Sequence, residues 1–213
     1  MEAKKLNKTS YLNQESQFKK VLLKNESLGT EPLTHRFLKC GEPNLDQLLQ
    51  GRLRFGTVSE WGLPPGQGLR PFIIKFLASS CGPAVWIHSS AEKVIYPPAW
   101  SAAGAPLDEL FFISSVQPVS ELKPLFLEGL FSVIVLDGPE KLKRGEMAFL
   151  ASQAREIKAH IFLLRPFFLS QKSPNPYARV RVNGQKSRTG DCQFQLVRGG
   201  VGKVDIPSPY PFF

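Results

Sequence analysis

A glycine-rich loop is the first stretch of the chain whose residue types could do chemistry. It reads Gly62-Leu63-Pro64-Pro65-Gly66-Gln67-Gly68 and joins an alternating strand expected at residues 57–61 to an apolar helix expected at residues 71–79. Glycines before a helix let backbone N–H groups surround phosphate oxygens. Gly62, Gly66 and Gly68 are therefore candidate ligands for the phosphates of a nucleotide cofactor.

The loop lacks the side chains that phosphate chemistry needs. The Walker A pattern, G-x-x-x-x-G-K-[ST], places a lysine against the β- and γ-phosphates and a hydroxyl on Mg²⁺. Counted from Gly62, the lysine position is Gly68 and the hydroxyl position is Leu69. Pro64 and Pro65 carry no N–H, which removes two donors from a phosphate nest. We interpret residues 62–68 as a vestigial phosphate loop; an ordinary glycine turn is the alternative.

A buried strand that ends in a carboxylate is the second candidate. Residues 131–137 form an apolar run that closes on Asp137, the pattern of a Walker B strand whose aspartate orders Mg²⁺. Asp137-Gly138-Pro139 is equally a good turn sequence. Because the glycine loop offers neither lysine nor hydroxyl to share the metal ion, we expect no catalytic residue, no metal site and no ATP or Mg²⁺ cofactor.

The elements that would position these residues alternate between strands and helices. Apolar strands are expected at residues 84–88, 110–113 and 161–165, and helices at residues 96–104, from Ser120 to Gly129, and at 146–158. Such alternation is typical of an α/β fold with a mainly parallel sheet flanked by helices. Residues 178–182 and 192–196 alternate around an Asn183-Gly184 turn, which predicts an antiparallel hairpin at one edge of the sheet.

The charge of the chain favours a polyanionic partner. Its 213 residues include 27 Lys and Arg against 18 Asp and Glu, a formal net charge of +9. This balance favours nucleic acid first and an acidic protein second, and a basic protein without such a partner is the alternative. The candidate DNA contacts are cations that follow expected strands or lie in the hairpin: Lys141, Lys143, Arg144, Arg165, Lys172, Arg179, Arg181, Lys186, Arg188 and Arg198.

Two of these cationic segments carry further detail. Phe167 and Phe168 precede Lys172, and aromatic rings beside cations suit the stacking of single-stranded bases; burial of both rings in the core is the alternative. In the hairpin, Arg179 and Arg181 are expected on an outer face, opposite an inner face formed by Ala178, Val180 and Val182. Charges on such a strand also protect a sheet edge from aggregation, which is the other interpretation.

The two ends of the chain differ in composition from the middle. Residues 1–35 form a polar, basic tail in which Phe18 and Leu22 can share one side of a short helix. Residues 36–203 form the expected domain, and residues 204–213 form a proline-rich tail that ends in Phe212 and Phe213. The four apolar residues are candidate partner-binding residues, although disorder of the first tail and packing of the second onto its own domain are alternatives.

Cysteine usage and hydropathy favour a reducing, aqueous compartment. Cys40, Cys81 and Cys192 are odd in number and widely spaced, which predicts neither a disulfide framework nor a zinc site. No apolar run approaches the roughly 18 residues of a membrane span, and the N-terminus has no signal core. We expect a soluble, cytoplasmic protein with no membrane partner.

The order of these motifs resembles that of the RecA recombinase family. Residues 41–62 follow the pattern G-x-x-x-LD-x-LL-x-G-x-L-x-x-G-x-V-x-E-x-G, which is similar to the segment that leads into the P-loop of RecA. More closely, the chain resembles the ImuA-type proteins, RecA-like accessory factors of bacterial mutagenic (translesion) DNA synthesis. The resemblance continues through residues 96–104, 131–137, 161–165 and 178–200, and so covers about residues 36–200.

The resemblance implies a RecA-like fold and a non-catalytic adaptor role in error-prone DNA synthesis during the SOS response to DNA damage. It implies binding to DNA, single-stranded in preference, and two protein partners: an ImuB-like inactive Y-family polymerase and RecA. It also implies an N-terminal docking helix and a nucleoid-associated location in the bacterial cytoplasm. Two other functions remain open: a DNA-dependent ATPase of RecA type with an atypical P-loop, and a SulA-like cell-division inhibitor.

Overall fold

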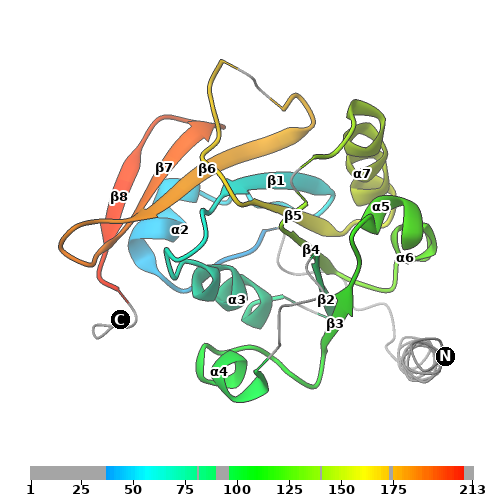
Figure 1. The fold of residues 1–213 in the computed structure, drawn as a ribbon, viewed down its shortest axis with the longest axis horizontal. Coiled ribbons are helices and arrows are strands. Elements are labelled where there is room, and N and C mark those ends of the chain that lie inside the picture. Colours follow the sequence, from blue (N-terminus) through cyan, green and yellow to red (C-terminus); the bar gives the residue numbers. More distant parts are fainter. Residues whose placement is uncertain (1–36, 81, 90–95, 140, 173–174, 209–213) are drawn as a thin grey trace, which may run out of the picture. The chain divides into compact units, whose positions relative to one another are not determined.

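An eight-stranded, mostly parallel sheet organises the protein (Figure 1). The computed structural model describes residues 37–80, 82–89, 96–139, 141–172 and 175–208. In chain order the strands are β1 Thr57–Gly62, β2 Ala84–His88, β3 Leu110–Ser114, β4 Val133–Asp137, β5 His160–Arg165, β6 Ala178–Lys186, β7 Cys192–Arg198 and β8 Lys203–Ile206. The spatial order is β3-β2-β4-β5-β1-β6-β7-β8.

Pairing is parallel from β3 through β6 and antiparallel between β6, β7 and β8. The predicted α/β class, with a mainly parallel sheet and an antiparallel hairpin at one edge, is therefore confirmed. Because the six parallel strands point the same way, the loops that follow β1, β4, β5 and β6 begin at one edge of the sheet. That edge is where ligands bind in open α/β sheets.

The helices flank the sheet and begin close to the predicted positions. They are α2 Pro43–Leu49, α3 Arg70–Ala78, α4 Pro97–Ala102, α5 Pro118–Glu121, α6 Lys123–Leu127 and α7 Arg144–Glu156. The prediction of one helix capped by Ser120 is wrong, because Pro118 begins α5 and Ser120 lies inside it. A second short helix, α6, follows with Pro124 in its first turn, where the missing N–H costs no hydrogen bond. Within the described ranges, no helix has the length and apolarity needed to cross a bilayer.

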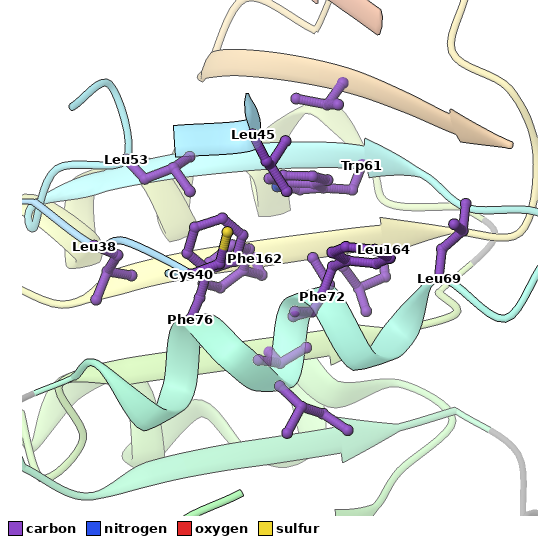
Figure 2. Close-up of a cluster of buried hydrophobic side chains, with 14 of the residues drawn as sticks. Leu38, Cys40, Leu45, Leu53, Trp61, Leu69, Phe72, Phe76, Phe162 and Leu164 are labelled. Carbon is purple, nitrogen blue, oxygen red and sulfur yellow. The ribbon is translucent and has the colours of Figure 1, made fainter. Parts of the chain in front are cut away.

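The face of the sheet that meets α2 and α3 carries an aromatic core (Figure 2). The Trp61 ring of β1 lies 5.9 Å from the Phe76 ring of α3 and 6.1 Å from the Phe162 ring of β5, measured between centroids. Phe72 and Phe76 are four residues apart, so both point from one side of α3 toward the sheet. Each such ring stabilises the fold by roughly 1.5–3 kcal/mol through burial.

A buried chain of polar groups crosses the same region. The Trp61 indole donates to Ser59 Oγ at 3.0 Å, and Ser59 Oγ lies 2.9 Å from His160 Nε2. His160 Nδ1 lies 2.9 Å from the Arg54 carbonyl oxygen, which can only accept, so Nδ1 carries the proton and Nε2 accepts from Ser59. Burial lowers the pKa of His160 to about 4, so the imidazole is neutral at pH 7.

The opposite face of the sheet is only partly covered by helices. α7 packs on β1 and β5, and α6 packs on α7. The described part of the chain places no helix in comparable contact with β6 or β7. This uncovered part, together with the same side of β8, carries six polar side chains, and we call it the amide face: Asn183, Gln185, Gln193, Gln195, Lys203 and Asp205.

The sheet extends beyond the predicted end of the domain. Residues 203–206 form β8, which pairs with β7, and Ile206 is buried. The predicted C-terminal tail of residues 204–213 therefore begins inside the sheet. Its last two residues, Phe212 and Phe213, lie outside the described residues, and so do Phe18 and Leu22 at the N-terminal end.

Candidate functional site

Asp137, the last residue of β4, is held by an arginine of the protein itself. The guanidinium of Arg70, the first residue of α3, donates from Nε to Oδ2 at 2.9 Å and from Nη2 to Oδ1 at 2.7 Å. The Asp137 side chain is only 3% exposed. A bidentate arginine–carboxylate pair of this kind is among the strongest hydrogen-bonded ion pairs in proteins. Both oxygens that a Walker B aspartate would turn toward Mg²⁺ thus face an internal cation.

The glycine-rich loop of residues 62–68 is packed against strand β6. Leu69, at the hydroxyl position of a Walker A motif, is buried, and so is Leu63. Both leucines reach Gly184 so closely that a Cβ added there would lie 2.8 Å from each. Gln67 accepts a hydrogen bond from the Lys186 backbone N–H at 2.6 Å. Apolar packing and a side-chain amide therefore fix this loop onto the sheet.

The three glycines of this loop serve different backbone requirements. Gly66 and Gly68 have φ of 77° and 61°, a region that favours glycine, and a Cβ on either would meet nothing within 4 Å. Gly62 ends β1 at a close approach of chain segments. A Cβ there would overlap Asn183 Oδ1 and lie 2.8 Å from the Phe167 carbonyl oxygen. Gly62 is therefore required for the position of the loop that follows β5.

Two of the predicted DNA contacts are buried, and this part of the prediction is corrected. Arg165 Nε lies 2.9 Å from Glu60 Oε1, and Arg181 Nε lies 2.8 Å from Glu60 Oε2. All three side chains are at most 5% exposed. Arg165 also donates to the Pro139 carbonyl oxygen. Both guanidinium groups are therefore occupied inside the protein and give no surface for phosphate.

The expected face pattern of β6 fails at its first residues. Ala178 pairs with Val58 and Val180 pairs with Ser59, so two steps along β6 match one step along β1. This irregularity is a β-bulge centred on Arg179, and a bulge re-aims the residues around it. Arg179 is exposed, but Ala178 and Val180 face opposite sides of the sheet.

The predicted turn at Asn183-Gly184 is also wrong, because β6 continues to Lys186. The turn lies between Ser187 and Asp191, where the Ser187 N–H donates to the Asp191 carbonyl oxygen at 2.7 Å. Cys192 pairs with Lys186, and Asn183 pairs with Gln195. The antiparallel hairpin is present; its loop holds Arg188, whereas Lys186 is the last residue of β6.

A loop after β5 lies along β6 and presents two aromatic side chains. The Asn183 side chain makes two hydrogen bonds with the backbone of Leu169. Its Oδ1 accepts from the Leu169 N–H at 2.7 Å, and its Nδ2 donates to the Leu169 carbonyl oxygen at 3.0 Å. One residue later, Arg181 donates to the Ser170 carbonyl oxygen at 2.9 Å. Leu169 is buried, whereas Phe167 and Phe168 are 46% and 50% exposed. The interpretation that both rings join the core is therefore wrong.

A polar pocket lies between this loop and the amide face. It encloses about 160 Å³ and is lined by Phe168, Asn183, Gln185, Gln193 and Gln195. One aromatic ring and four side-chain amides thus meet at the junction of β6 and β7. Such a lining can stack a planar group and hydrogen-bond its edge.

The remaining predicted cations are spread over separate parts of the surface. The following are exposed: Lys141, Lys143, Arg144, Lys172, Arg179, Arg188 and Arg198; Lys186 is half-buried. Arg144 Nε lies 3.4 Å from the Tyr177 hydroxyl, which links the start of α7 to the start of β6. Arg198 donates to the Asn175 carbonyl oxygen at 2.6 Å. The structure thus brings only part of this set to the amide face.

Sequence reasoning missed the pocket and the strand β8 that carries one cation beside it. Lys203 is exposed and pairs in register with Gln195, so it lies on the amide face. The period of two in Lys203-Val204-Asp205-Ile206, with Ile206 buried, was the signal that could have identified this strand. The pocket required the register of β6 with β7, which puts Gln185 opposite Gln193.

The described residues hold no group of three or more His, Cys, Asp or Glu side chains that could bind a metal ion. Cys40 and Cys192 are buried free thiols, and burial raises the pKa of Cys40 to about 12. Cys81 lies outside the described residues.

Comparison with protein-family models and with curated proteins gives no match for this chain. The function is therefore inferred from the arrangement of its residues.

Proposed function

We propose that this protein is a non-catalytic adaptor that binds single-stranded DNA across its amide face. The observation that carries the proposal is the exposure of Phe167 and Phe168 on a loop whose neighbouring residues are anchored to β6. Proteins that bind single strands combine aromatic rings, on which bases stack, with cations that follow the phosphates. Each stacked base contributes about 1–3 kcal/mol to such binding.

Cations at the margins of the amide face supply the phosphate contacts. Arg188 lies in the loop at one end of the β6–β7 hairpin, and Arg198 lies at the other end, opposite Arg181. Lys203 lies across the face on β8, and Lys172 follows the two phenylalanines in the chain. The formal net charge of +9 adds a general attraction for a polyanion.

We propose a non-catalytic role because of the residues at two positions that resemble Walker motifs, Asp137 and Leu69. Arg70 holds both oxygens of Asp137, and Leu69 is buried where a Walker A motif has its hydroxyl. A nucleotide–Mg²⁺ complex would have to displace the arginine and expose the leucine. These features weigh against the alternative of a DNA-dependent ATPase.

The finer proposal is that the fold is RecA-like and that the adaptor serves error-prone translesion synthesis, as ImuA-type proteins do. It is supported by the order of motifs over residues 36–200 and by the degenerate phosphate loop. The proposed protein partners are an ImuB-like inactive Y-family polymerase and RecA. Co-purification of each partner with the full chain, with and without DNA, tests this part separately.

Fluorescence anisotropy with labelled oligonucleotides tests DNA binding. The full chain is titrated against single-stranded and duplex DNA of one sequence over a salt series, with and without ATP–Mg²⁺. We expect tighter binding to the single strand, a fall in affinity with salt and no effect of ATP. Binding that requires ATP would restore the ATPase alternative, and no binding to either DNA would overturn the proposal.

Matched charge variants locate the contact surface. Arg188→Gln and Lys203→Gln should each reduce the slope of log K against log salt by about 0.7, the value for one phosphate contact on a single strand. Lys158→Gln removes the same charge from an exposed residue between α7 and β5. Equal slopes for all three variants would place the DNA elsewhere on the molecule.

A further inference from the structure

We infer that the pocket beside Phe168 binds one unstacked nucleobase, with the base ring on Phe168 and the base edge on the Gln195 amide. The inference rests on the proposed function, since single-stranded DNA would supply the base. It adds a defined subsite to a surface that otherwise needs only general stacking and phosphate contacts. Four properties of the lining support it.

The first property is a chain of amides whose direction is fixed. Gln185 Nε2 donates to Gln193 Oε1 at 2.6 Å, and Gln193 Nε2 donates to Asp205 Oδ1 at 2.7 Å. An ionised carboxylate can only accept, so Asp205 forces the amide nitrogen of Gln193 toward itself. The Gln193 oxygen must then face Gln185. This chain of exposed hydrogen bonds forms a polar wall across β6, β7 and β8.

The second property is that Asn183 is already committed. Its side-chain oxygen and nitrogen both bind the backbone of Leu169. Asn183 therefore contributes shape to the pocket and holds the aromatic loop in place. These two hydrogen bonds fix the orientation of the amide and leave one lone pair and one N–H.

The third property is the amide of Gln195. Gln195 pairs with Asn183 in register, is exposed and lines the pocket, and its side chain makes no hydrogen bond within the described part of the chain. An amide presents an acceptor beside a donor, and it can bind the Watson–Crick edge of a base through two hydrogen bonds. In a duplex that edge faces the opposite base, so the contact selects an unpaired base.

The fourth property is the ring of Phe168. It is half exposed and lines the pocket, and its loop is anchored at the next residue, where the Leu169 N–H donates to Asn183 Oδ1 of β6. Phe167 is exposed to a similar degree but does not line the pocket. Phe167→Ala therefore serves as the comparison for Phe168→Ala, since it removes a ring of the same loop that lies outside the pocket.

The experiment compares two oligonucleotides with equal numbers of phosphates: oligo-dT, and the same backbone with abasic sites. Anisotropy titrations of the full chain should give at least about tenfold tighter binding to oligo-dT, because stacking and the edge contact require a base. Phe168→Ala and Gln195→Ala should each remove most of this difference. Phe167→Ala should remove less of it than either, because Phe167 does not line the pocket, and the salt slopes of all variants should remain equal, since no phosphate contact is lost.

The outcomes separate the inference from the proposed function. Salt-sensitive binding that is equal for the two oligonucleotides would overturn the base pocket and leave a DNA-binding protein that contacts phosphate. A base-dependent difference that Phe167→Ala removes and Phe168→Ala does not would also overturn it. No binding to either oligonucleotide would overturn both. Circular dichroism verifies the fold, which these half-exposed side chains should not alter.

Discussion

Arg70 places its guanidinium across both carboxylate oxygens of Asp137 and so joins the start of α3 to the end of β4. These two positions flank the site where a nucleotide-binding protein of this architecture holds phosphate and Mg²⁺. Here Arg70, a cation of the same chain, binds both oxygens of the aspartate where Mg²⁺ would otherwise bind. The protein thus fixes the relative position of α3 and β4 without a ligand.

Arg70→Ala should lower the free energy of unfolding by about 2 kcal/mol, because it removes the cation that contacts both oxygens of this buried carboxylate. The Arg70 side chain is 30% exposed, so solvent reduces the loss below that of a fully buried pair. Urea unfolding followed by circular dichroism measures the change. The double variant that also carries Asp137→Asn should recover part of the lost stability. Arg70→Ala should still show no ATP turnover, because Leu69 remains buried. Unchanged stability would mean that the pair contributes nothing.

Glu60→Gln should lower the free energy of unfolding by about 3–5 kcal/mol, more than Arg70→Ala does, since it leaves two buried guanidinium groups without a counter-charge. Arg165 and Arg181 are each at most 5% exposed and approach separate oxygens of Glu60. Urea unfolding is again the measurement. Glu128→Gln, at an exposed position, provides the matched loss of one carboxylate and should stay within about 0.5 kcal/mol of the parent. Similar values for the two variants would contradict the role of Glu60.

The neutral, buried His160 predicts that stability falls with pH below neutrality. Its pKa is about 4 in the folded protein and 6.5 in the reference state, so between these values the unfolded chain binds a proton that the folded protein does not. Stability should therefore fall from about pH 6.5 to pH 4, by about 3 kcal/mol for this group, and the contribution should level off below pH 4.

Unfolding curves at pH 7, 5.5 and 4.5 measure the total effect, and His160→Gln isolates the histidine, since this variant should show a shallower fall. Nitrogen NMR of the parent provides a direct test at pH 5. The ring should remain neutral with the proton on Nδ1, as its contact with the Arg54 carbonyl oxygen requires. A charged ring at pH 5 would refute the assignment.

The two loop glycines Gly62 and Gly66 should respond differently to the same substitution. Gly62→Ala brings a Cβ into Asn183 and the Phe167 carbonyl oxygen, so it should cost roughly 1–3 kcal/mol and displace the aromatic loop. Gly66→Ala meets open space and should cost about 1 kcal/mol for its left-handed backbone alone. Thermal unfolding gives the stabilities, and DNA binding should weaken only for Gly62→Ala. Equal DNA affinities would show that the loop position is unimportant.

The parallel core of the sheet could be predicted from the sequence because its strands are buried on both faces. Residues 84–88, 133–137 and 161–165 are apolar almost throughout, and each run lies within a strand of the sheet. The run at 133–137 also predicted that Asp137 would lie at a carboxyl end. Its partner could not be predicted, because Arg70 lies 67 residues earlier in the chain.

The hairpin shows how tertiary contacts override a local signal. Asn183-Gly184 is a typical turn sequence. In the protein, Asn183 is needed for its side-chain contacts with Leu169, and Gly184 is needed because Leu63 and Leu69 leave no room for a Cβ. Both residues serve neighbours that are distant in sequence. They therefore resemble a turn for reasons unrelated to chain reversal.

The buried arginines were misplaced for a similar reason. A period of two shows that Arg181 lies on the face of β6 opposite Val180 and Val182, but it does not show what covers that face. Arg181 pairs with Glu60, which is 121 residues away. Only the folded sheet shows that this arginine faces a carboxylate and not water.

The place of β1 in the sheet also determines when the protein can fold during synthesis. This strand, Thr57–Gly62, has β5 on one side and β6 on the other, and their first residues are His160 and Ala178. A ribosome must therefore add more than a hundred residues after β1 before either neighbour is complete. Folding that depends on such distant pairings is slow, and it leaves Val58 and Trp61 of β1 exposed meanwhile. The nascent chain should therefore need a chaperone until its C-terminal third has emerged.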